Sequence, residues 1–527
     1  MAPSVVHLPD GQNFTVQPVF SGLFFKSNEL NTHPAPFPSG WTVVLHSEDS
    51  SEDPPGSGDH RNGHHHGGQH HDGHEHHKRR SHIHKYNRPT LQNDTIFISS
   101  ISNPSSSDYK PHSSPSRQIA LMLWVTLYWY FQQPEPSPYL DTEHSKHTPL
   151  EAKPKGDWRI KIKRDGVFRT KNMIPKLERM GLIRTFESAV GTSIEENNQG
   201  WDNMFVSRSM FWQIHSGLFL FTLQPMKHST SNPGSPVTSR PTSPVKSEMI
   251  TNTIASATSS NCSLATDLPG GPIPTTLTSV PSFPIGPYYS SSHLPTFYPP
   301  APLQYTITNN IRHPLRQKPP RMGEIFYTRF VPSVGKYLSF RVASLSPKPV
   351  PCLGPVGPGE KEHNHLSTLA DTALLQMWLS NPRVQAFWGA YHPDFLSDAL
   401  KSRHSFPAIG MWDGVPFGYF ELYWVKEDPL GQRMGNDAQD FDRGLHVLVG
   451  EEWARGKVNY WLTSLVHWCW QADYRTMNIC LEPRVDNTRF IPHLENAGFM
   501  KEKQISFPHK QAWLFRLRRD AWEGPAL

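Results

Sequence analysis

Hydrophobic and polar positions divide the chain into two patterned regions, roughly residues 1–225 and 320–527, which are separated by a long polar tract. The first region contains a strongly apolar run at 119–131, bounded by Arg117 and Pro134. This run is several residues short of the ~20 that span a bilayer. We therefore expect a buried helix or strand there and no membrane-spanning segment.

The second region changes between strand-like and helix-like periodicity, which predicts a mixed α/β sheet flanked by helices. Asp413-Gly414 separates two strand-forming segments, and this dipeptide is favoured in tight two-residue hairpin turns. The expected elements are a helix at 368–381, strands at 406–414, 415–428 and 444–450, a helix at 457–471, a strand at 476–482, a helix at 487–496, and strands at 504–508 and 511–518. Their order predicts a βαβα core.

One short pattern, Leu-Glu-x-x-Gly-apolar, occurs in both regions, as KLERMGL at 176–182 and HLENAGF at 493–499. It permits two interpretations. The fold is duplicated, or the pattern is only a common helix end with a C-terminal glycine.

Two polar tracts are predicted to lie outside the folded regions. Residues 49–94 carry a dense histidine cluster among Ser, Asp and Gly and cannot bury enough apolar surface to fold, so we expect a disordered insertion without a fixed metal site. Residues 227–318 are rich in Ser, Thr and Pro and predict a linker. Proline, at 51 of 527 residues, is roughly twice its average usage of about 5%.

Charge and cysteine content narrow the possible partners. Lys and Arg (51) exceed Asp and Glu (46) by five charges, which is too few for a nucleic-acid-binding surface of this length. The four cysteines lack the spacing of a disulfide framework or a metal knuckle, and the N-terminus lacks a secretory signal. We expect a protein of a reducing compartment that binds neither nucleic acid nor membrane and needs no metal.

The most informative segment, 444–470, predicts a strand, a short loop and an amphipathic helix. Backbone N–H groups and a helix N-terminus in this order can face an anionic pyrophosphate, which suits coenzyme A. The expected cofactor contacts are Val449, Gly450, Arg455, Gly456 and Lys457.

Four segments in this order resemble the siderophore branch of the GNAT acyltransferases, namely 377–396, 416–428, 442–457 and 482–499. The resemblance covers about 320–520, with weaker similarity at 157–183. It implies a catalytic GNAT domain at 320–527, in which two diverging strands admit the pantetheine arm, preceded by a degenerate GNAT-like domain at 1–225. The loop departs from the family pattern, because Arg455-Gly456 is kept while the later glycine is missing. Which backbone amides contact the pyrophosphate is therefore open.

The resemblance implies acyl transfer from acyl-CoA to N5-hydroxy-L-ornithine, as in fungal N5-hydroxyornithine acyltransferases and, on lysine, the bacterial aerobactin and mycobactin acylases. The product is a hydroxamate, the group with which a siderophore binds ferric iron. Acetyl is the expected acyl group, with a bulkier mevalonyl-type group as the alternative. A homodimer and a cytosolic location are further expectations. The peroxisome is the alternative compartment, although Pro525-Ala526-Leu527 differs from Ser-Lys-Leu at two of three positions.

Acyl transfer needs a group that takes the acceptor's proton and donors for the developing oxyanion. His446 alternates with Leu445 and Val447, so its imidazole should point to the opposite face of the sheet. An isolated histidine there would more often be a hydrogen-bonded core residue, but the resemblance places a functional His or Asp at this strand position.

A carboxylate is expected beside His446. Glu482 closes the next strand, where the resemblance implies a partner for the histidine. Asp486 is the alternative, although its place in a turn also suits a helix cap. Asn487 resembles the GNAT asparagine that contacts the pantetheine arm, or it is an N-cap.

Four further residues are expected to bind the acceptor. Trp388 and His392 belong to the family-like segment 377–396, where aromatic faces would wall the pocket or simply fill the core. Glu421 and Tyr423 share one face of a strand, so the carboxylate would bind the acceptor's α-amine or lie on a solvated face.

Two other functions remain alternatives. In the first, the enzyme acylates N6-hydroxylysine or an ordinary amine. In the second, the protein is a catalytically inactive GNAT scaffold that interacts through its His-rich and Ser/Pro tracts. The missing loop glycine favours the scaffold, whereas His446, Glu482 and Arg455-Gly456 favour an enzyme.

Overall fold

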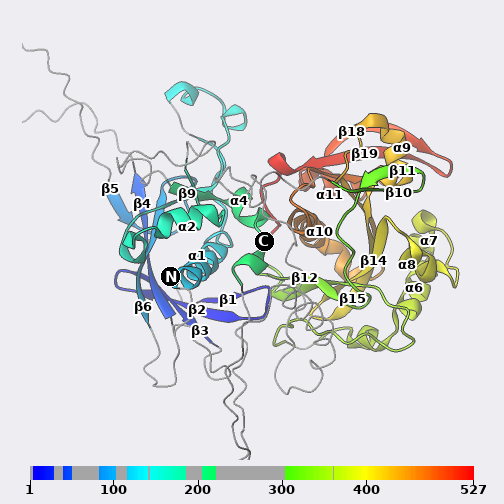
Figure 1. The fold of residues 1–527 in the computed structure, drawn as a ribbon, viewed down its shortest axis with the longest axis horizontal. Helices are drawn as coiled ribbons and strands as arrows, with labels where there is room; N and C mark the ends of the chain where they lie inside the picture. The colour runs from blue at the N-terminus through cyan, green and yellow to red at the C-terminus, as the bar shows by residue number, and fades with distance from the viewer. Residues whose placement is uncertain are drawn as a thin grey trace, which may run out of the picture.

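The protein has two α/β halves that lie side by side, each built on one mixed sheet (Figure 1). The computed structural model describes residues 4–28, 40–49, 82–102, 115–140, 143–185, 204–220, 303–359 and 361–527. Residues 50–81 of the predicted insertion and 227–302 of the predicted linker lie outside the described residues.

The C-terminal half is an eight-stranded sheet ordered β12-β13-β14-β15-β16-β17-β19-β18. The strands are β12 (Ile325–Val331), β13 (Lys336–Val342), β14 (Ser405–Trp412), β15 (Val415–Trp424), β16 (Arg443–Val449), β17 (Asn478–Leu481), β18 (Met500–Phe507) and β19 (Lys510–Arg518). Only β16 and β17 run parallel, and they pair at just two positions, Arg443 with Ile479 and Gly444 with Cys480. A helix joins them, as a parallel crossover requires.

Helices cover both faces of this sheet (Figure 1). They are α6 (Asp371–Leu379), α7 (Pro382–Trp388), α8 (Phe395–Lys401), α9 (Pro429–Met434), α10 (Val458–Ala472) and α11 (Ile491–Asn496). The crossover helix α10 packs on one face, and its Trp461 and Leu465 are buried in the same core as Leu445. On the other face, Trp378 of α6 and Val384 of α7 form a second core cluster with Leu448.

The predicted hairpin and both C-terminal helices are present, with one boundary corrected. Asp413 and Gly414 have φ values of 47° and 82°, the left-handed conformations that a tight two-residue hairpin turn needs. The helix expected at 487–496 begins only at Ile491, because Phe490 is its N-cap. Asn487 is therefore not the N-cap.

The N-terminal half has the strand order β1-β2-β3-β4-β6-β7-β9-β8, with β5 paired to β4. Its strands are β1 (Ser4–His7), β2 (Asn13–Val19), β3 (Gly22–Ser27), β4 (Gly40–Asp49), β5 (His82–Lys85), β6 (Asp94–Ser102), β7 (Arg159–Ile162), β8 (Arg184–Thr185) and β9 (Met204–Ser207), and its helices include α1 (Pro115–Tyr130), α2 (Met173–Arg179) and α4 (Arg208–Gln213). The apolar run at 119–131 is thus a helix in nearly its whole length.

The two halves repeat one topology. In each, a helix crosses between the only parallel pair of the sheet, α1 between β6 and β7 and α10 between β16 and β17. The shared Leu-Glu-x-x-Gly pattern ends the equivalent helices α2 and α11 identically, since Leu182 N–H donates to Leu177 O and Phe499 N–H to Leu494 O, both at 3.0 Å. The N-terminal copy lacks counterparts of α6–α8, because a tight turn joins β2 directly to β3.

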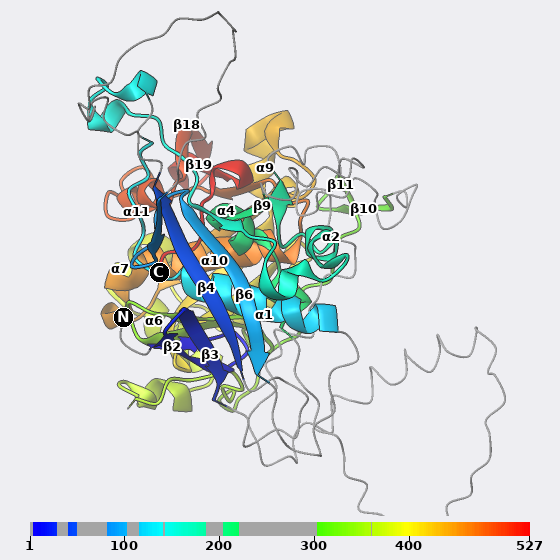
Figure 2. The same cartoon turned by 90° about the vertical axis from the view of Figure 1, so that its left-hand side faces the viewer.

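The halves share one continuous core. Every residue of α1 from Ile119 onward is buried, with β4 and β6 in front of it in Figure 2. Trp212 of α4 bridges to the other half, because its ring lies 5.3 Å from that of Tyr128 and 5.6 Å from that of His467 on α10. The N-terminal half therefore supports α10, the helix that follows the predicted cofactor loop.

Both polar tracts are shorter than the sequence predicts. Residues 82–85 form strand β5, which pairs with β4, and Asp94 begins β6, so both ends of 82–94 are in the N-terminal sheet. Residues 303–318 contain the hairpin of β10 (Tyr305–Thr308) and β11 (Ile311–Pro314), which is attached to the C-terminal half. Arg316 after this hairpin forms an ion pair with the buried Glu427, so side-chain contacts fix what composition assigned to a linker.

A buried ion pair between β13 and α6 gives a test of stability. Arg341 donates two hydrogen bonds of 2.6 Å to Asp371, and neither side chain is more than 2% exposed. Asp371→Ala leaves the guanidinium buried without its counter-ion, so we expect the free energy of unfolding to fall by about 3–5 kcal/mol in chemical denaturation. Asp398→Ala removes the exposed partner of Lys401 and should cost less than about 1 kcal/mol. Equal losses in the two variants would contradict this account.

Candidate active site

A gap opens where β16 and β17 diverge. Their pairing stops at Gly444 and Cys480, after which β16 continues to Val449 along β15 alone. His446 lies on the β16 side of the gap and Glu482 directly follows β17 on the other side. The divergence therefore places His446 and Glu482 on opposite sides of the gap.

His446 and Glu482 meet at this gap. Nε2 of His446 lies 3.2 Å from Oε1 of Glu482, the distance of an ion pair, although the angle is poor for a hydrogen bond. Nδ1 lies 3.7 Å from Oε2 of Glu421, which is directly opposite His446 on β15. The imidazole is 32% exposed, so solvent or a substrate can reach it. As predicted, it faces away from Leu445, which packs in the core with α10.

Two side chains, those of Tyr423 and Lys510, fix the position of Glu482. The hydroxyl of Tyr423 donates to Oε2 at 2.8 Å. The ammonium of Lys510 on β19 donates to the main-chain oxygen of Glu482 at 2.9 Å and lies 3.5 Å from Oε1. Tyr423 is 1% exposed, and its hydroxyl holds the Glu482 carboxylate in place.

Gly444 makes the approach of Tyr423 possible. A Cβ atom at this position would lie 2.1 Å from Cζ of the Tyr423 ring and 2.6 Å from its hydroxyl oxygen. The ring therefore rests directly on the backbone of β16, and any side chain there would displace the hydroxyl from Glu482. Gly444 has a packing role that alternation alone does not indicate.

The pair is charged at neutral pH. Burial alone would lower the pKa of His446, but the charges of Glu482 and then Glu421 outweigh it and raise this pKa to about 9. Burial alone would raise the pKa of Glu482, but the imidazolium of His446 and the ammonium of Lys510 lower it to about 2. Burial, with the charge of Glu482, also raises the pKa of Tyr423 well above its ordinary value, so its hydroxyl remains a donor.

Aromatic side chains form a wall beside the pair. The ring of Trp388 lies 6.4 Å from that of His446 and 5.8 Å from that of Tyr419, and its Nε1 donates to Val447 O at 3.3 Å. The hydroxyl of Tyr419 donates to Oε1 of Glu421 at 2.7 Å. His392 is exposed, and its ring lies 5.6 Å from that of Phe395.

Three of the residues around the pair were not predicted. Tyr419 shares the period-two face of Glu421 and Tyr423, so alternation along β15 could have found it. Lys510 and Gly444 carry no such signal. Lys510 reaches the site only because β19 lies next to β17.

Asp486 and Asn487 lie outside the cluster. Both carboxylate oxygens of Asp486 accept from Arg484, at 2.6 and 2.9 Å, and its side chain is 59% exposed. Among the contacts of residues 361–527, none joins Asp486 to His446. The main-chain oxygen of Asn487 accepts from Phe490 and Ile491 and shapes the turn into α11.

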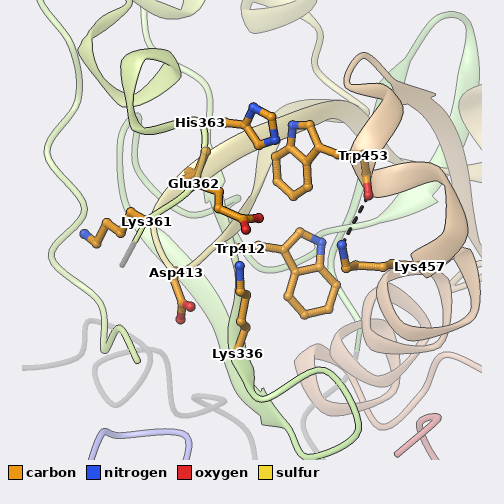
Figure 3. A pocket seen from close by; sticks show the side chains of 9 residues that line it. Lys336, Lys361, Glu362, His363, Trp412, Asp413, Trp453 and Lys457 are labelled. Carbon is orange, nitrogen blue, oxygen red and sulfur yellow. Dashed lines mark hydrogen bonds between the residues drawn. The ribbon is translucent and has the colours of Figure 1, made fainter. Parts of the chain in front are cut away.

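The predicted cofactor loop is a 3₁₀ helix, η10 (Glu452–Lys457), with two different sides. Arg455 lies on one side, 3.7 Å from Glu452 Oε1. Lys457 lies on the other and, with Trp453, lines a cavity of about 240 Å³ (Figure 3). A Cβ atom at Gly456 would meet no atom within 4 Å, so there is room for a ligand beside the loop.

The glycine that precedes η10 has a packing role. A Cβ atom at Gly450 would lie 2.3 Å from the ring of Trp378 on α6, so the absence of a side chain lets α6 pack against the end of β16. Val449, just before it, is the last residue of β16 along the gap.

Within the described ranges, no group of three or more His, Cys, Asp or Glu side chains has the arrangement of a metal site. In the same ranges, no helix has both the length and the apolar character needed to cross a bilayer.

Similarity to known proteins identifies the family. The acetyltransferase (GNAT) domain model matches residues 367–507, which include the gap and η10. The N5-hydroxyornithine acetylase sidL of Beauveria bassiana (strain ARSEF 2860) is 56% identical over 540 residues, which cover 97% of this chain and 100% of that relative. The chain belongs to the N5-hydroxyornithine acetylase family of GNAT acyltransferases. The family and the GNAT-type mixed sheet that the sequence predicts are thereby confirmed.

Other relatives of this GNAT acyltransferase match smaller parts of it. The N(6)-hydroxylysine O-acetyltransferase of Escherichia coli is 37% identical over 204 residues, 37% of this chain and 56% of that protein. The N(5)-hydroxyornithine:cis-anhydromevalonyl coenzyme A-N(5)-transacylase SIDF of Beauveria bassiana is 32% identical over 244 residues, 42% of this chain and 48% of that protein. The solved aminoglycoside acetyltransferase AAC(6')-Ib with coenzyme A is 21% identical, with a TM-score of 0.27, and its match covers 35% of this chain and 96% of that one.

The charged pair predicts a pH dependence of stability. The raised pKa of His446 gives stability that is complete below its ordinary value of 6.5 and is lost as pH rises through about 9. The lowered pKa of Glu482 gives stability that is complete above 4.5 and is lost as pH falls through about 2. Both contributions are therefore present between pH 4.5 and 6.5.

His446→Gln should reduce the free energy of unfolding most at pH 5 to 6 and least near pH 10, as measured by denaturation at each pH. The matched variant His509→Gln, at an exposed hairpin position, should cost little at either pH. A loss for His446→Gln that is the same at pH 6 and pH 10 would show that the ion pair does not form.

Proposed function

We propose that this GNAT acyltransferase transfers an acetyl group from acetyl-CoA to N5 of N5-hydroxy-L-ornithine and so forms the hydroxamate of a siderophore. The observation that carries the proposal is the His446–Glu482 pair at the gap between β16 and β17. The near-full-length similarity to an N5-hydroxyornithine acetylase supports this acceptor and this acyl group.

The exposed edge of β16 suits the thioester. Gly450 N–H faces β15, since it donates to Phe417 O, and backbone groups alternate along a strand. The backbone N–H and C=O groups of Val447 therefore face the gap. Its oxygen accepts there from Nε1 of Trp388. Its N–H points the same way and is our candidate donor to the oxyanion that develops during acyl transfer.

The reaction needs one proton acceptor. The nitrogen of a hydroxylamine is largely neutral at pH 7, so it attacks the thioester carbonyl directly, forming the C–N bond. Neutral His446 takes the N–H proton, the C–S bond breaks as the oxyanion collapses, and the thiolate leaves and recovers a proton from the imidazolium. Glu482 stays ionised throughout and keeps the imidazole aimed into the gap.

The remaining polar groups position the pair. Tyr423 and Lys510 fix Glu482, and Glu421 faces the second nitrogen of His446. Because Glu421 is so close to His446, it lies near the reacting nitrogen and not at the α-amine, which is at the other end of the acceptor's aliphatic chain. We therefore assign Glu421 to orienting His446, and Trp388 with Tyr419 to walling the acceptor.

Hydroxamate formation tests the proposal. Purified protein with acetyl-CoA should acylate N5-hydroxyornithine in preference to ornithine and N6-hydroxylysine, and should use acetyl-CoA in preference to a bulkier acyl-CoA. His446→Ala should lower kcat by about 10²- to 10⁴-fold, the usual size of general-base catalysis. His509→Ala, at the exposed hairpin, is the matched control and should keep wild-type turnover. Absence of turnover with every pair, from folded protein, would leave the inactive-scaffold alternative.

The rate should rise with pH. Because the pKa of His446 is about 9, only a minor fraction of the free enzyme carries the neutral base at pH 7. We expect kcat/KM to increase by about tenfold per pH unit above pH 7 and to level off near pH 9. Glu482→Gln removes the counter-charge and should move this rise to lower pH, whereas the exposed Glu495→Gln should not. A rate that falls between pH 7 and 9 would contradict the role of His446 as base.

A further inference from the structure

The gap between β16 and β17 has an open end and a closed end. At the open end, β16 stops at Val449 and the chain continues into η10, the predicted cofactor loop. At the closed end, Gly444 and Cys480 form the last residue pair between the two strands. A donor whose nucleotide lies at η10 therefore points its acyl group along β16 toward the closed end.

One aromatic ring fills the closed end on the face that carries His446. Tyr423 lies directly opposite Gly444 on β15, and a Cβ atom at Gly444 would be 2.1 Å from Cζ of this ring. The centroid of the ring lies 4.5 Å from that of His446. The hydroxyl reaches Glu482, which follows β17, at 2.8 Å. The side chain thus extends from β15 across the backbone of β16 to the far side of the gap.

The space around this ring is already packed. Tyr423 is 1% exposed and belongs to a buried cluster that includes Cys480 and Leu514. On the opposite face of the sheet, Leu445 and Leu481 are each 2% exposed and belong to the core that contains α10. A protein interior has no room for added methylene groups unless a side chain moves.

Helix α7 covers the gap nearer its open end. Arg383, at the start of α7, donates to Gly450 O at 3.1 Å, on the β16 side. Arg484, which follows β17, donates to Ala386 O at 2.8 Å from the other side. Helix α7 therefore lies across the gap, and Trp388 at its end faces His446. A long acyl chain has no way out past this helix, so the closed end is the direction that remains.

We propose that the ring of Tyr423 determines the specificity for the acyl group, because it closes the gap to anything much larger than acetyl. The inference rests on the proposed function, which places the thioester carbonyl at Val447. From there the methyl group of acetyl fits in front of the ring, whereas further methylene groups have to displace it. The two parts of Tyr423 then have separate roles: the hydroxyl holds Glu482, and the ring limits the length of the acyl group.

Two substitutions separate the ring from its hydroxyl. Tyr423→Leu shortens the side chain but keeps an apolar group in the buried cluster. The ratio of kcat/KM for butyryl-CoA to that for acetyl-CoA, with N5-hydroxyornithine as acceptor, should rise by about 10- to 100-fold, the usual worth of methylene groups in a closed pocket. Tyr423→Phe keeps the ring, so this ratio should stay within about twofold of wild type, less than one methylene is worth. Its kcat should fall with both donors, because Glu482 loses a hydrogen bond.

Tyr419 supplies a matched control. It is buried on the same face of β15, but its partner on β16 is Leu448, nearer the open end. Tyr419→Leu removes an equal ring from the acceptor wall and should change KM for N5-hydroxyornithine. The butyryl-to-acetyl ratio should stay within about twofold of wild type. An equal rise of the ratio in Tyr419→Leu and Tyr423→Leu would contradict the inference, since loosened packing alone would then admit the longer chain.

Donor binding without an acceptor tests the same point in a variant that has lost turnover. In calorimetric titrations, wild type should bind acetyl-CoA about tenfold more tightly than butyryl-CoA, and Tyr423→Leu should bring the two affinities within about twofold of each other. Circular dichroism shows whether each variant is folded, and Tyr423→Val replaces Tyr423→Leu if the latter is not. Equal affinities in wild type, or a difference that the substitution leaves unchanged, would overturn the inference.

The titrations also keep this inference distinct from the proposed function. A preference for acetyl-CoA that depends on Tyr423, in a protein that forms no hydroxamate, would support the role of the ring and contradict the proposed acceptor. Hydroxamate formation from acetyl-CoA, with a butyryl-to-acetyl ratio that is the same in wild type and Tyr423→Leu, would support the proposed function and overturn the role of the ring alone.

Discussion

The divergence of β16 from β17 is the constraint on which the site depends. The strands share two residue pairs and then separate, so among the strands that the structure describes none pairs with this edge of β16 from Leu445 onward. Backbone groups along a buried edge are costly unless other groups satisfy them. The indole of Trp388 does so at Val447. The proposed reaction places the acyl donor along the rest of this edge.

Charge placed in this gap has to be held in position. His446 stays partly open to solvent while Glu482 is buried, and Tyr423 and Lys510 secure the carboxylate from two other strands. Gly444 has to lack a side chain for Tyr423 to reach it. The resulting ion pair is charged at neutral pH, so the proposed base is held in its protonated form.

The N-terminal half repeats the topology of the C-terminal half. It repeats the parallel strand pair, the crossover helix and the glycine-ended helix. It has no counterparts of α6–α8, the helices that follow β13 and precede β14 along the chain, because β2 joins β3 by a tight turn. Its helices instead pack against α10 through Trp212 and His467. Burial lowers the pKa of His467 to about 3, so its ring is neutral where it packs against Trp212. The copy supports the loop end of the catalytic half.

The sequence by itself determined the order of strands β14 to β19 and of helices α10 and α11 between them, the hairpin at Asp413-Gly414 and the face on which His446 lies, because strand alternation and turn conformation depend on neighbouring residues. The order of four motifs was also enough to indicate the family. The sequence did not determine that the hydroxyl of Tyr423 bonds to Glu482 or that Asp486 pairs with Arg484 at the surface. Composition placed residues 82–94 and 303–318 outside the fold, although strand pairing and the contacts of Arg316 hold them within it.

Only the tertiary structure brought Lys510 to Glu482 and Arg383 to the loop after β16. Lys510 arrives because β19 pairs with β17, and Arg383 arrives because α7 is laid across the gap. Such partners are set by which strands are neighbours and by how a helix packs on them. Local periodicity has no information about either, since the interacting residues are far apart in the chain and meet only when the sheet has formed.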